Sequence, residues 1–133
     1  MNDFNGDIPI GSPNLNGPME FADDNFAKSY EALLMQMQNN YKTVKIYCLN
    51  IAFVCDTYHF LKPNGGGSTL LEYRKMIEEI ATAYESNVIH LNRLNIRDAN
   101  MPKYSPDDKH PNAKMMSMIA NQCYNEIIAS NCF

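Results

Sequence analysis

Apolar residues recur at helical spacing in three stretches of this 133-residue chain. The first stretch follows Asp23 or Asp24, either of which suits a helix N-cap, and ends near residues 39–40. The second helix is predicted to start near Thr69, and the third at Asn112 or just before it. The apolar faces expected of these three helices are, in order, Phe26, Tyr30, Leu33, Leu34 and Met37; Leu70, Tyr73, Ile77, Ile80, Ala81 and Tyr84; and Met115, Met116, Ile119, Ala120, Cys123 and Ile127.

Two further runs, residues 44–54 and 87–91, are apolar almost throughout. Such runs are typical of strands that are covered on both faces in a parallel sheet. Strands that alternate with helices of ten or more residues predict an α/β domain. We therefore expect one domain over residues 1–133, in which residues 1–22 form a loop. Residues 23–133 are expected to run helix, strand, helix, strand, loop, helix.

Glycine and proline mark the loops. Residues 62–68 contain three consecutive glycines, which suit a phosphate-binding loop, but no Gly-Lys-Ser/Thr sequence follows them. The preferred interpretation is a mobile surface loop. Ligands of parallel sheets bind beyond the carboxyl ends of the strands, so the loops to search are residues 56–68 and 92–110.

Composition excludes several classes of protein. The net charge of −4 and the pI near 5.2 give no basic field for nucleic acid. No apolar run reaches the roughly 20 residues of a membrane-spanning helix, and residues 1–17 lack the pattern of a signal peptide. The four cysteines form no C-x-x-C pair and are expected to be free thiols, which weakly indicates a reducing compartment. Histidine spacing predicts no metal site, and we expect no cofactor.

The loop after the second predicted strand contains Asp107 and His110, followed by Pro111 and Asn112. A carboxylate three residues before a histidine can accept a hydrogen bond from the imidazole and leave the other ring nitrogen as a general base. Alone, the pattern also suits a capped and solvated helix start. Its position after the last strand, and the opening sequence Asn2-Asp3-Phe4, favour the catalytic interpretation.

The chain contains, in order, Asn2-Asp3, two helix–strand units and Asp107-x-x-His110-Pro-Asn. In the order of these motifs it resembles the SGNH, or GDSL-type, serine ester hydrolases. The resemblance spans essentially the whole chain and begins inside the family's third block, Gly-x-Asn-Asp. It implies a flavodoxin-like three-layer α/β/α sandwich. It also implies hydrolysis of small acyl or acetyl esters, including carbohydrate-linked ones.

The resemblance also implies a role for each matching residue. His110 would be the general base that takes the proton of a serine hydroxyl, and Asp107 would orient it. The Asn2 side chain would donate a hydrogen bond to the oxyanion of the intermediate. His59, which follows the first predicted strand, is a candidate for lining the substrate cleft; the alternative is a surface histidine.

The departure from the family is that its first two blocks, including the Gly-Asp-Ser nucleophile, are absent. Ser105 is near His110 in sequence, but it is predicted to be a turn former. The chain alone is therefore predicted to be inactive. The alternative function is a non-catalytic remnant or interaction module; a flavodoxin-like nucleotide binder is disfavoured because no phosphate loop is present.

The resemblance also predicts that the sheet is incomplete, because the family has further strands before the position of Met1. The strand at residues 44–54 would then keep an unpaired apolar edge, which promotes pairing with another chain. We expect another polypeptide, or a second copy, to complete the sheet. A truncated sequence is the alternative explanation.

Overall fold

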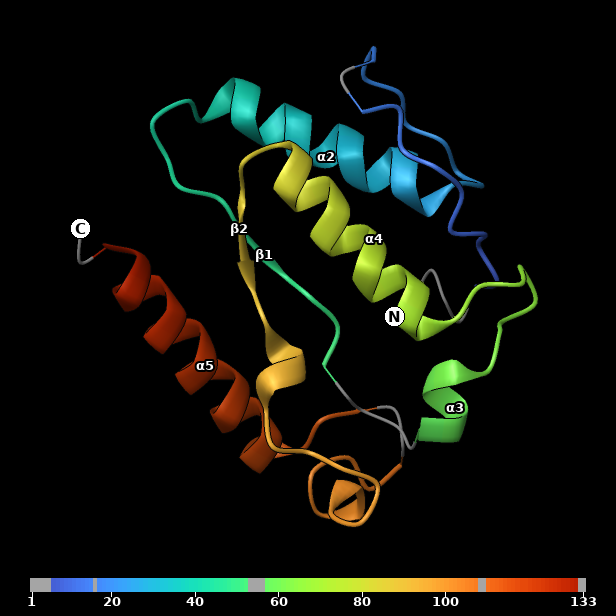
Figure 1. The fold of residues 1–133 in the computed structure, drawn as a ribbon, viewed down its shortest axis with the longest axis vertical. Coiled ribbons are helices and arrows are strands. Elements are labelled where there is room, and N and C mark those ends of the chain that lie inside the picture. The colour runs from blue at the N-terminus through green and yellow to red at the C-terminus, as the bar shows by residue number, and fades with distance from the viewer. Residues whose placement is uncertain (1–5, 16, 53–56, 108–109, 132–133) are drawn as a thin grey trace. The chain divides into compact units, whose positions relative to one another are not determined.

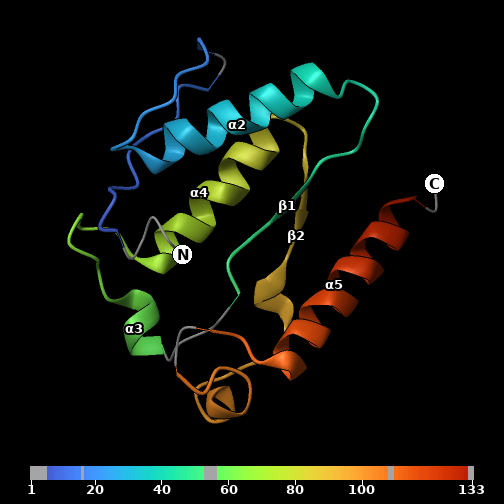
Figure 2. The ribbon, with the colours of Figure 1, turned by 180° about the vertical axis from the view of Figure 1, so that it is seen from behind.

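The computed structural model describes residues 6–15, 17–52, 57–107 and 110–131. Figures 1 and 2 show the elements from two sides. The four helices among these residues are α2 (Phe26–Asn40), α3 (Thr57–Leu61), α4 (Leu70–Ala83) and α5 (Ala113–Asn131). The strands are β1 (Tyr47–Leu49) and β2 (Asn87–Ile89), and the 3₁₀ turns are η1 (Leu91–Arg93) and η2 (Met101–Lys103). The three predicted helices and two predicted strands are therefore present, whereas α3 was not predicted.

β1 and β2 form a parallel pair. The amide of Asn87 donates to the carbonyl of Ile46 (3.0 Å), and the amide of Asn50 donates to that of Ile89 (3.1 Å), so residue numbers rise in the same direction along both strands. The protein is thus mixed α/β, as predicted. Both strands are shorter than the apolar runs that predicted them, because within the described residues each strand has one neighbour and β2 gives way to η1.

The first of two compact units comprises residues 1–48 and 61–88. The N-cap of α2 is Asn25, whose Oδ1 accepts from the Lys28 amide at 3.0 Å, and not the predicted Asp23 or Asp24. Thr69 caps α4 as expected, in a capping box with Glu72. The buried apolar residues of this unit are Ala27, Ala32, Leu34, Cys48, Leu70, Tyr73, Ile77, Ile80 and Ala81.

The predicted apolar face of α2 divides into a buried and an exposed part. Leu34 is buried, but Leu33 and Met37 keep 48% and 38% of their surface exposed. Helix α4 packs against α2, and the buried residues of α2 include Ala27 and Leu34. The helical spacing of the five residues predicted the helix correctly, but spacing alone does not show which of them are covered, and Leu33 and Met37 are exposed.

The glycine-rich turn is bonded to the segment that precedes α2. The amide of Gly65 donates to Asp7 Oδ1 (2.6 Å), and Ser68 Oγ accepts from the Ile10 amide (3.1 Å). A Cβ on Gly66 would lie 2.5 Å from the Asp7 carbonyl oxygen, and Gly67 has φ +80°. The glycines permit a close approach between two backbones and a left-handed residue. The loop lies largely at the surface, as predicted, and hydrogen bonds join it to the segment before α2.

The second unit comprises residues 49–60 and 89–133. Its buried apolar residues are Ala52, Phe60, Ile89, Leu91, Leu94, Ile96, Met101 and Met115. Met115 lies on the buried side of α5 as predicted, but Met116 and Ala120, expected on the same side, are exposed. They lie on the sector of α5 that this unit leaves uncovered. No helix among the described residues is both long and apolar enough to cross a membrane.

The cysteines that the structure describes are free thiols. Cys48 is buried in the first unit, and Cys123 is half-buried in the second. Burial raises the pKa of the Cys48 thiol, so the thiol stays protonated and acts as a small apolar group. Cys55 and Cys132 lie outside the described residues.

Candidate functional site

Asp107 and His110 are brought together in the loop that leads into α5. Asp107 Oδ1 accepts from the His110 amide (2.8 Å), and Asp107 Oδ2 lies 2.7 Å from His110 Nδ1. A carboxylate at Nδ1 selects the tautomer with the proton on that nitrogen, and so leaves the Nε2 lone pair available as a base. The predicted acid–histidine pair is present in the structure.

The pair is open to solvent, since 81% of the His110 side chain and 55% of the Asp107 side chain are exposed. An exposed polar contact of this kind contributes about 0–1 kcal/mol to stability. So small a contribution to stability does not explain why the two side chains are held in this geometry. What the arrangement provides is a histidine whose orientation is set and whose second nitrogen can be reached by a substrate.

Asn112 fixes the loop around this pair. Its Oδ1 accepts from the amides of Lys114 and Met115 (both 3.1 Å), which caps α5 one residue before the helix begins. Its Nδ2 donates to the Lys103 carbonyl (2.8 Å), and its amide donates to the Tyr104 carbonyl (2.8 Å). The predicted helix cap thus also ties the loop back to η2, two residues after His110.

The carboxyl ends of the two strands carry a second polar group that the sequence analysis did not single out. Asn50 is 2% exposed, and its Oδ1 accepts from the Leu91 amide at 2.7 Å. Its Nδ2 donates to Asn92 Oδ1 at 3.0 Å. This pair links the residues that follow β1 to those that follow β2. The available signals were Asn92, directly after the second predicted strand, and Asn50, a polar residue inside the first apolar run.

The positions of the other predicted site residues do not distinguish between the roles predicted for them. Asn2 lies outside the described residues. His59 lies on α3, exposed, with its ring edge-to-face against Tyr58 at 5.3 Å between centroids. The position of His59 fits either predicted interpretation, cleft or surface. The third histidine, His90, follows β2, and its amide donates to Glu126 on α5 (3.1 Å).

Two serines that the structure describes are unsuited to act as the nucleophile. Ser105 is fully buried, and its Oγ has no hydrogen-bond partner among the described residues. Ser68 is 5% exposed and accepts from the Ile10 amide. Neither hydroxyl is open to a substrate, which agrees with the prediction that Ser105 is a structural residue.

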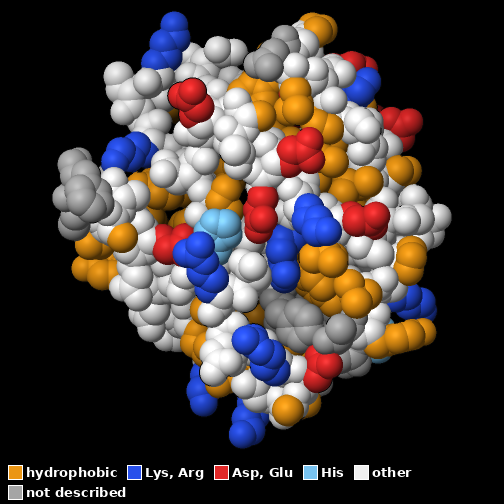
Figure 3. All heavy atoms as spheres, viewed as in Figure 1, with side chains coloured by type: hydrophobic (Ala, Val, Ile, Leu, Met, Phe, Trp, Pro, Cys, Tyr) orange, Lys and Arg blue, Asp and Glu red, His pale blue; other side chains and the backbone are white. Residues whose placement is uncertain are grey.

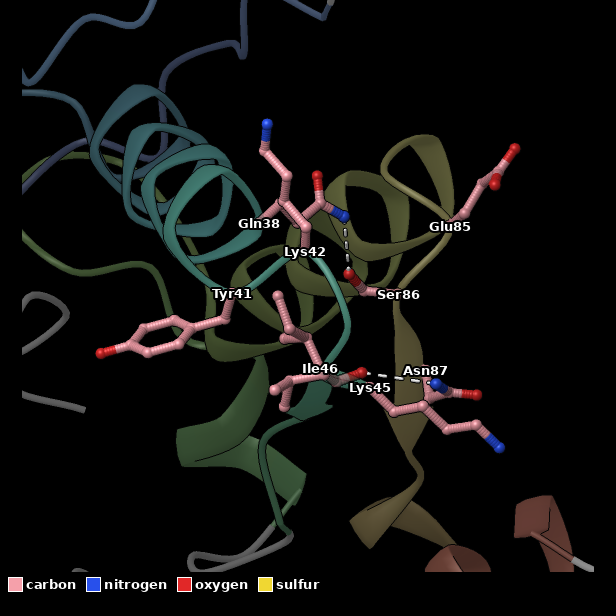
Figure 4. Close-up of a pocket in the computed structure, with 9 residues that line it drawn as sticks. Gln38, Tyr41, Lys42, Lys45, Ile46, Glu85, Ser86 and Asn87 are labelled. Carbon is pink, nitrogen blue, oxygen red and sulfur yellow. Dashed lines mark hydrogen bonds between the residues drawn. The ribbon is translucent and has the colours of Figure 1, made fainter.

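A hollow of about 380 Å³ lies in the first unit, at the amino ends of the strands. Its residues come from the end of α2, the segment before β1, the turn between α4 and β2, and the first residue of β2 (Figure 4). Figure 4 shows the charged ends of Lys42, Lys45 and Glu85 pointing in different directions. Ligands of parallel sheets bind beyond the carboxyl ends of the strands, whereas this hollow lies at their amino ends. The His110 loop therefore remains the better candidate site. The described residues contain no group of three or more metal-ligating side chains.

Comparison with known proteins gives a fold likeness alone. No protein-family model matches the chain, and no curated protein matches it. A crystal structure of a protein from Lactobacillus plantarum, from a structural genomics consortium, matches with a TM-score of 0.78 at 22% identity, over 99% of this chain and 64% of that one. A second crystal structure matches with a TM-score of 0.74 at 17% identity, over 96% and 60%. The chain therefore spans less than two thirds of either solved chain.

Proposed function

We propose that this chain carries the acid–base part of an SGNH-type serine ester hydrolase with a flavodoxin-like three-layer sandwich. The observation that carries the proposal is the 2.7 Å contact between Asp107 Oδ2 and His110 Nδ1, in the loop after the last strand. The motif order from Asn2 to Asn112 supports it. The serine comes from polypeptide outside this sequence, and the substrate is a small acyl or acetyl ester.

In this mechanism, the serine oxygen attacks the ester carbonyl while His110 Nε2 takes the hydroxyl proton. Asp107 stabilises the imidazolium that forms. The imidazolium then gives its proton to the leaving alcohol, which leaves an acyl-enzyme. Water attacks the acyl-enzyme with His110 again as the base, and the serine hydroxyl is restored as the acid departs.

The oxyanion of each tetrahedral intermediate needs hydrogen-bond donors. The proposal gives this role to the Asn2 amide, whose loss would cost about 3 kcal/mol of transition-state stabilisation. Among the described residues, Ile8 accepts a short hydrogen bond from the Tyr73 hydroxyl and the Ile10 amide donates to Ser68 Oγ. Residue 8 is six positions from Asn2.

The second candidate function is a non-catalytic interaction module. It is favoured by large apolar side chains that remain exposed, among them Leu33, Tyr41 and Tyr124. Such a module would bind a partner through these residues and would have no use for an oriented His110. The two candidates are therefore distinguished by activity.

The test joins this chain to the N-terminal segment of an SGNH hydrolase that contains a Gly-Asp-Ser block. Hydrolysis of p-nitrophenyl acetate is measured for the chain alone and for the joined protein. The matched control is the joined protein with the serine of that block changed to alanine. Activity in the joined protein alone supports the ester hydrolase; equal rates in all three proteins reject it.

A further inference from the structure

Helix α5 keeps an exposed apolar row that its own unit does not cover. Met116, Ala120, Tyr124 and Ile128 follow one another at intervals of four residues, which places them on one side of the helix. The three large members are 51%, 66% and 46% exposed. Lys114 and Glu126 are the only charged residues among the 19 of α5. A helix face that meets water is ordinarily rich in charged residues, so this row is typical of a covered face.

The size of the row limits what can cover it. A fully exposed side chain of this size offers about 200 Å², so the three large members together offer roughly 300 Å². Two copies that met only through α5 would bury about 600 Å² in total, half of the roughly 1,200 Å² of a stable interface. An interface between two copies formed by α5 alone would therefore be too small to be stable.

The same kind of exposure occurs independently in the other unit. Leu33 and Met37 on α2, with Tyr41 and Val44 just beyond its end, are between 38% and 60% exposed. On the face drawn in Figure 3, hydrophobic side chains reach the surface in several groups among the charged ones. The apolar exposure is thus not a local feature of α5.

The two solved proteins of this fold have polypeptide that this chain lacks. The Lactobacillus plantarum protein matches over 64% of its length, so about a third of it lies outside the match. Among the described residues the sheet has two strands, so each strand is paired along one edge. A segment of that length can supply both a strand and an apolar surface.

We propose that the row Met116–Ala120–Tyr124–Ile128 is the docking surface for a polypeptide that completes this fold, equivalent to the part of the solved proteins outside the match. This inference rests on the fold likeness and on the exposed row. It does not depend on ester hydrolysis.

The experiment compares the chain alone with the chain joined, through a flexible Gly/Ser linker, to the unmatched part of the Lactobacillus plantarum protein. Tyr124→Lys is introduced into both, and thermal midpoints are measured. Asn125→Lys, an exposed polar neighbour outside the row, is the matched control. Ile128→Lys repeats the test at a second position of the row.

We expect Tyr124→Lys and Ile128→Lys to shift the midpoint of the chain alone by less than about 2 °C and to lower that of the joined protein by about 5 °C or more. Asn125→Lys should leave both unchanged. Equal shifts in the two proteins, or no stabilisation of the chain by the joined segment, would overturn the proposal. So would a dimer of the chain alone, measured by light scattering, that Tyr124→Lys dissociates, since the row would then bind a second copy.

Discussion

Asp107→Asn tests whether the carboxylate orients His110 for catalysis. In the structure, Asp107 Oδ2 lies 2.7 Å from Nδ1, and in the proposed mechanism this contact leaves Nε2 as the base. An amide at this position can donate its own proton to Nδ1. That contact favours the other tautomer, in which Nε2 carries the proton and cannot take one from serine. The substitution also removes the charge that stabilises the imidazolium.

The expected loss in kcat is about 10³-fold, or roughly 4 kcal/mol of transition-state stabilisation. It is smaller than the roughly 10⁴-fold loss known for a buried triad in chymotrypsin-type proteases. The reason is that 55% of the Asp107 side chain is exposed, so water replaces part of its effect. The assay is hydrolysis of p-nitrophenyl acetate by the joined protein that carries the Gly-Asp-Ser segment.

Stability separates a catalytic effect from a structural one. An exposed pair contributes about 0–1 kcal/mol, so the thermal midpoint of Asp107→Asn should lie within a few degrees of the parent's. A kcat equal to that of the parent would refute the orienting role. A large drop in midpoint together with the loss of activity would show instead that Asp107 holds the loop.

Three further predictions concern the fold. Gly66→Ala should lower the unfolding free energy by about 1–3 kcal/mol in urea denaturation, because its Cβ would lie 2.5 Å from a backbone oxygen; a midpoint equal to the parent's contradicts the close approach. The buried Glu31 carboxylate accepts a hydrogen bond from the Tyr84 hydroxyl at 2.6 Å. Glu31→Ala should therefore lower the free energy of unfolding by about 2–4 kcal/mol, and Tyr84→Phe by about 1 kcal/mol. Equal losses of stability in the two variants would contradict this order. Hydrogen bonds from the Thr69 backbone and side chain lower the pKa of Glu72 in the folded protein. The Glu72 carboxylate therefore stabilises the fold fully above the unfolded-state pKa of about 4.3, and this stabilisation is lost as the pH falls through the lower folded-state pKa. Acid titration of stability should accordingly be less steep in Glu72→Gln, and identical curves would reject the effect.

Elements that follow local rules could be predicted from the sequence. The start of α4 at Thr69 and that of α5 after Asn112 depend on side chains that cap their own helix, so the nearby sequence contains the information. The contact between Asp107 and His110 is similarly local, because it spans three residues of one loop.

Features that depend on distant segments could not be predicted. The glycine-rich turn binds Asp7, which is 58 positions away from Gly65, and nothing in residues 62–68 indicates that partner. The exposure of Met116 depends on what packs against α5, whereas periodicity shows only that a face is apolar. Asn50 acquires its role because β2 lies beside β1, which brings the Leu91 amide to its side chain.

The central claim is that His110 is the base of an ester hydrolase. It is tested most directly by chemical rescue in the protein that joins this chain to the Gly-Asp-Ser segment of an SGNH hydrolase. His110→Ala should lower kcat for p-nitrophenyl acetate by about 10³-fold or more, and added imidazole should restore part of it at a site that is open to solvent. His59→Ala, the matched exposed histidine, should leave kcat unchanged and alter KM at most. A His110→Ala protein with the kcat of its parent would contradict the claim.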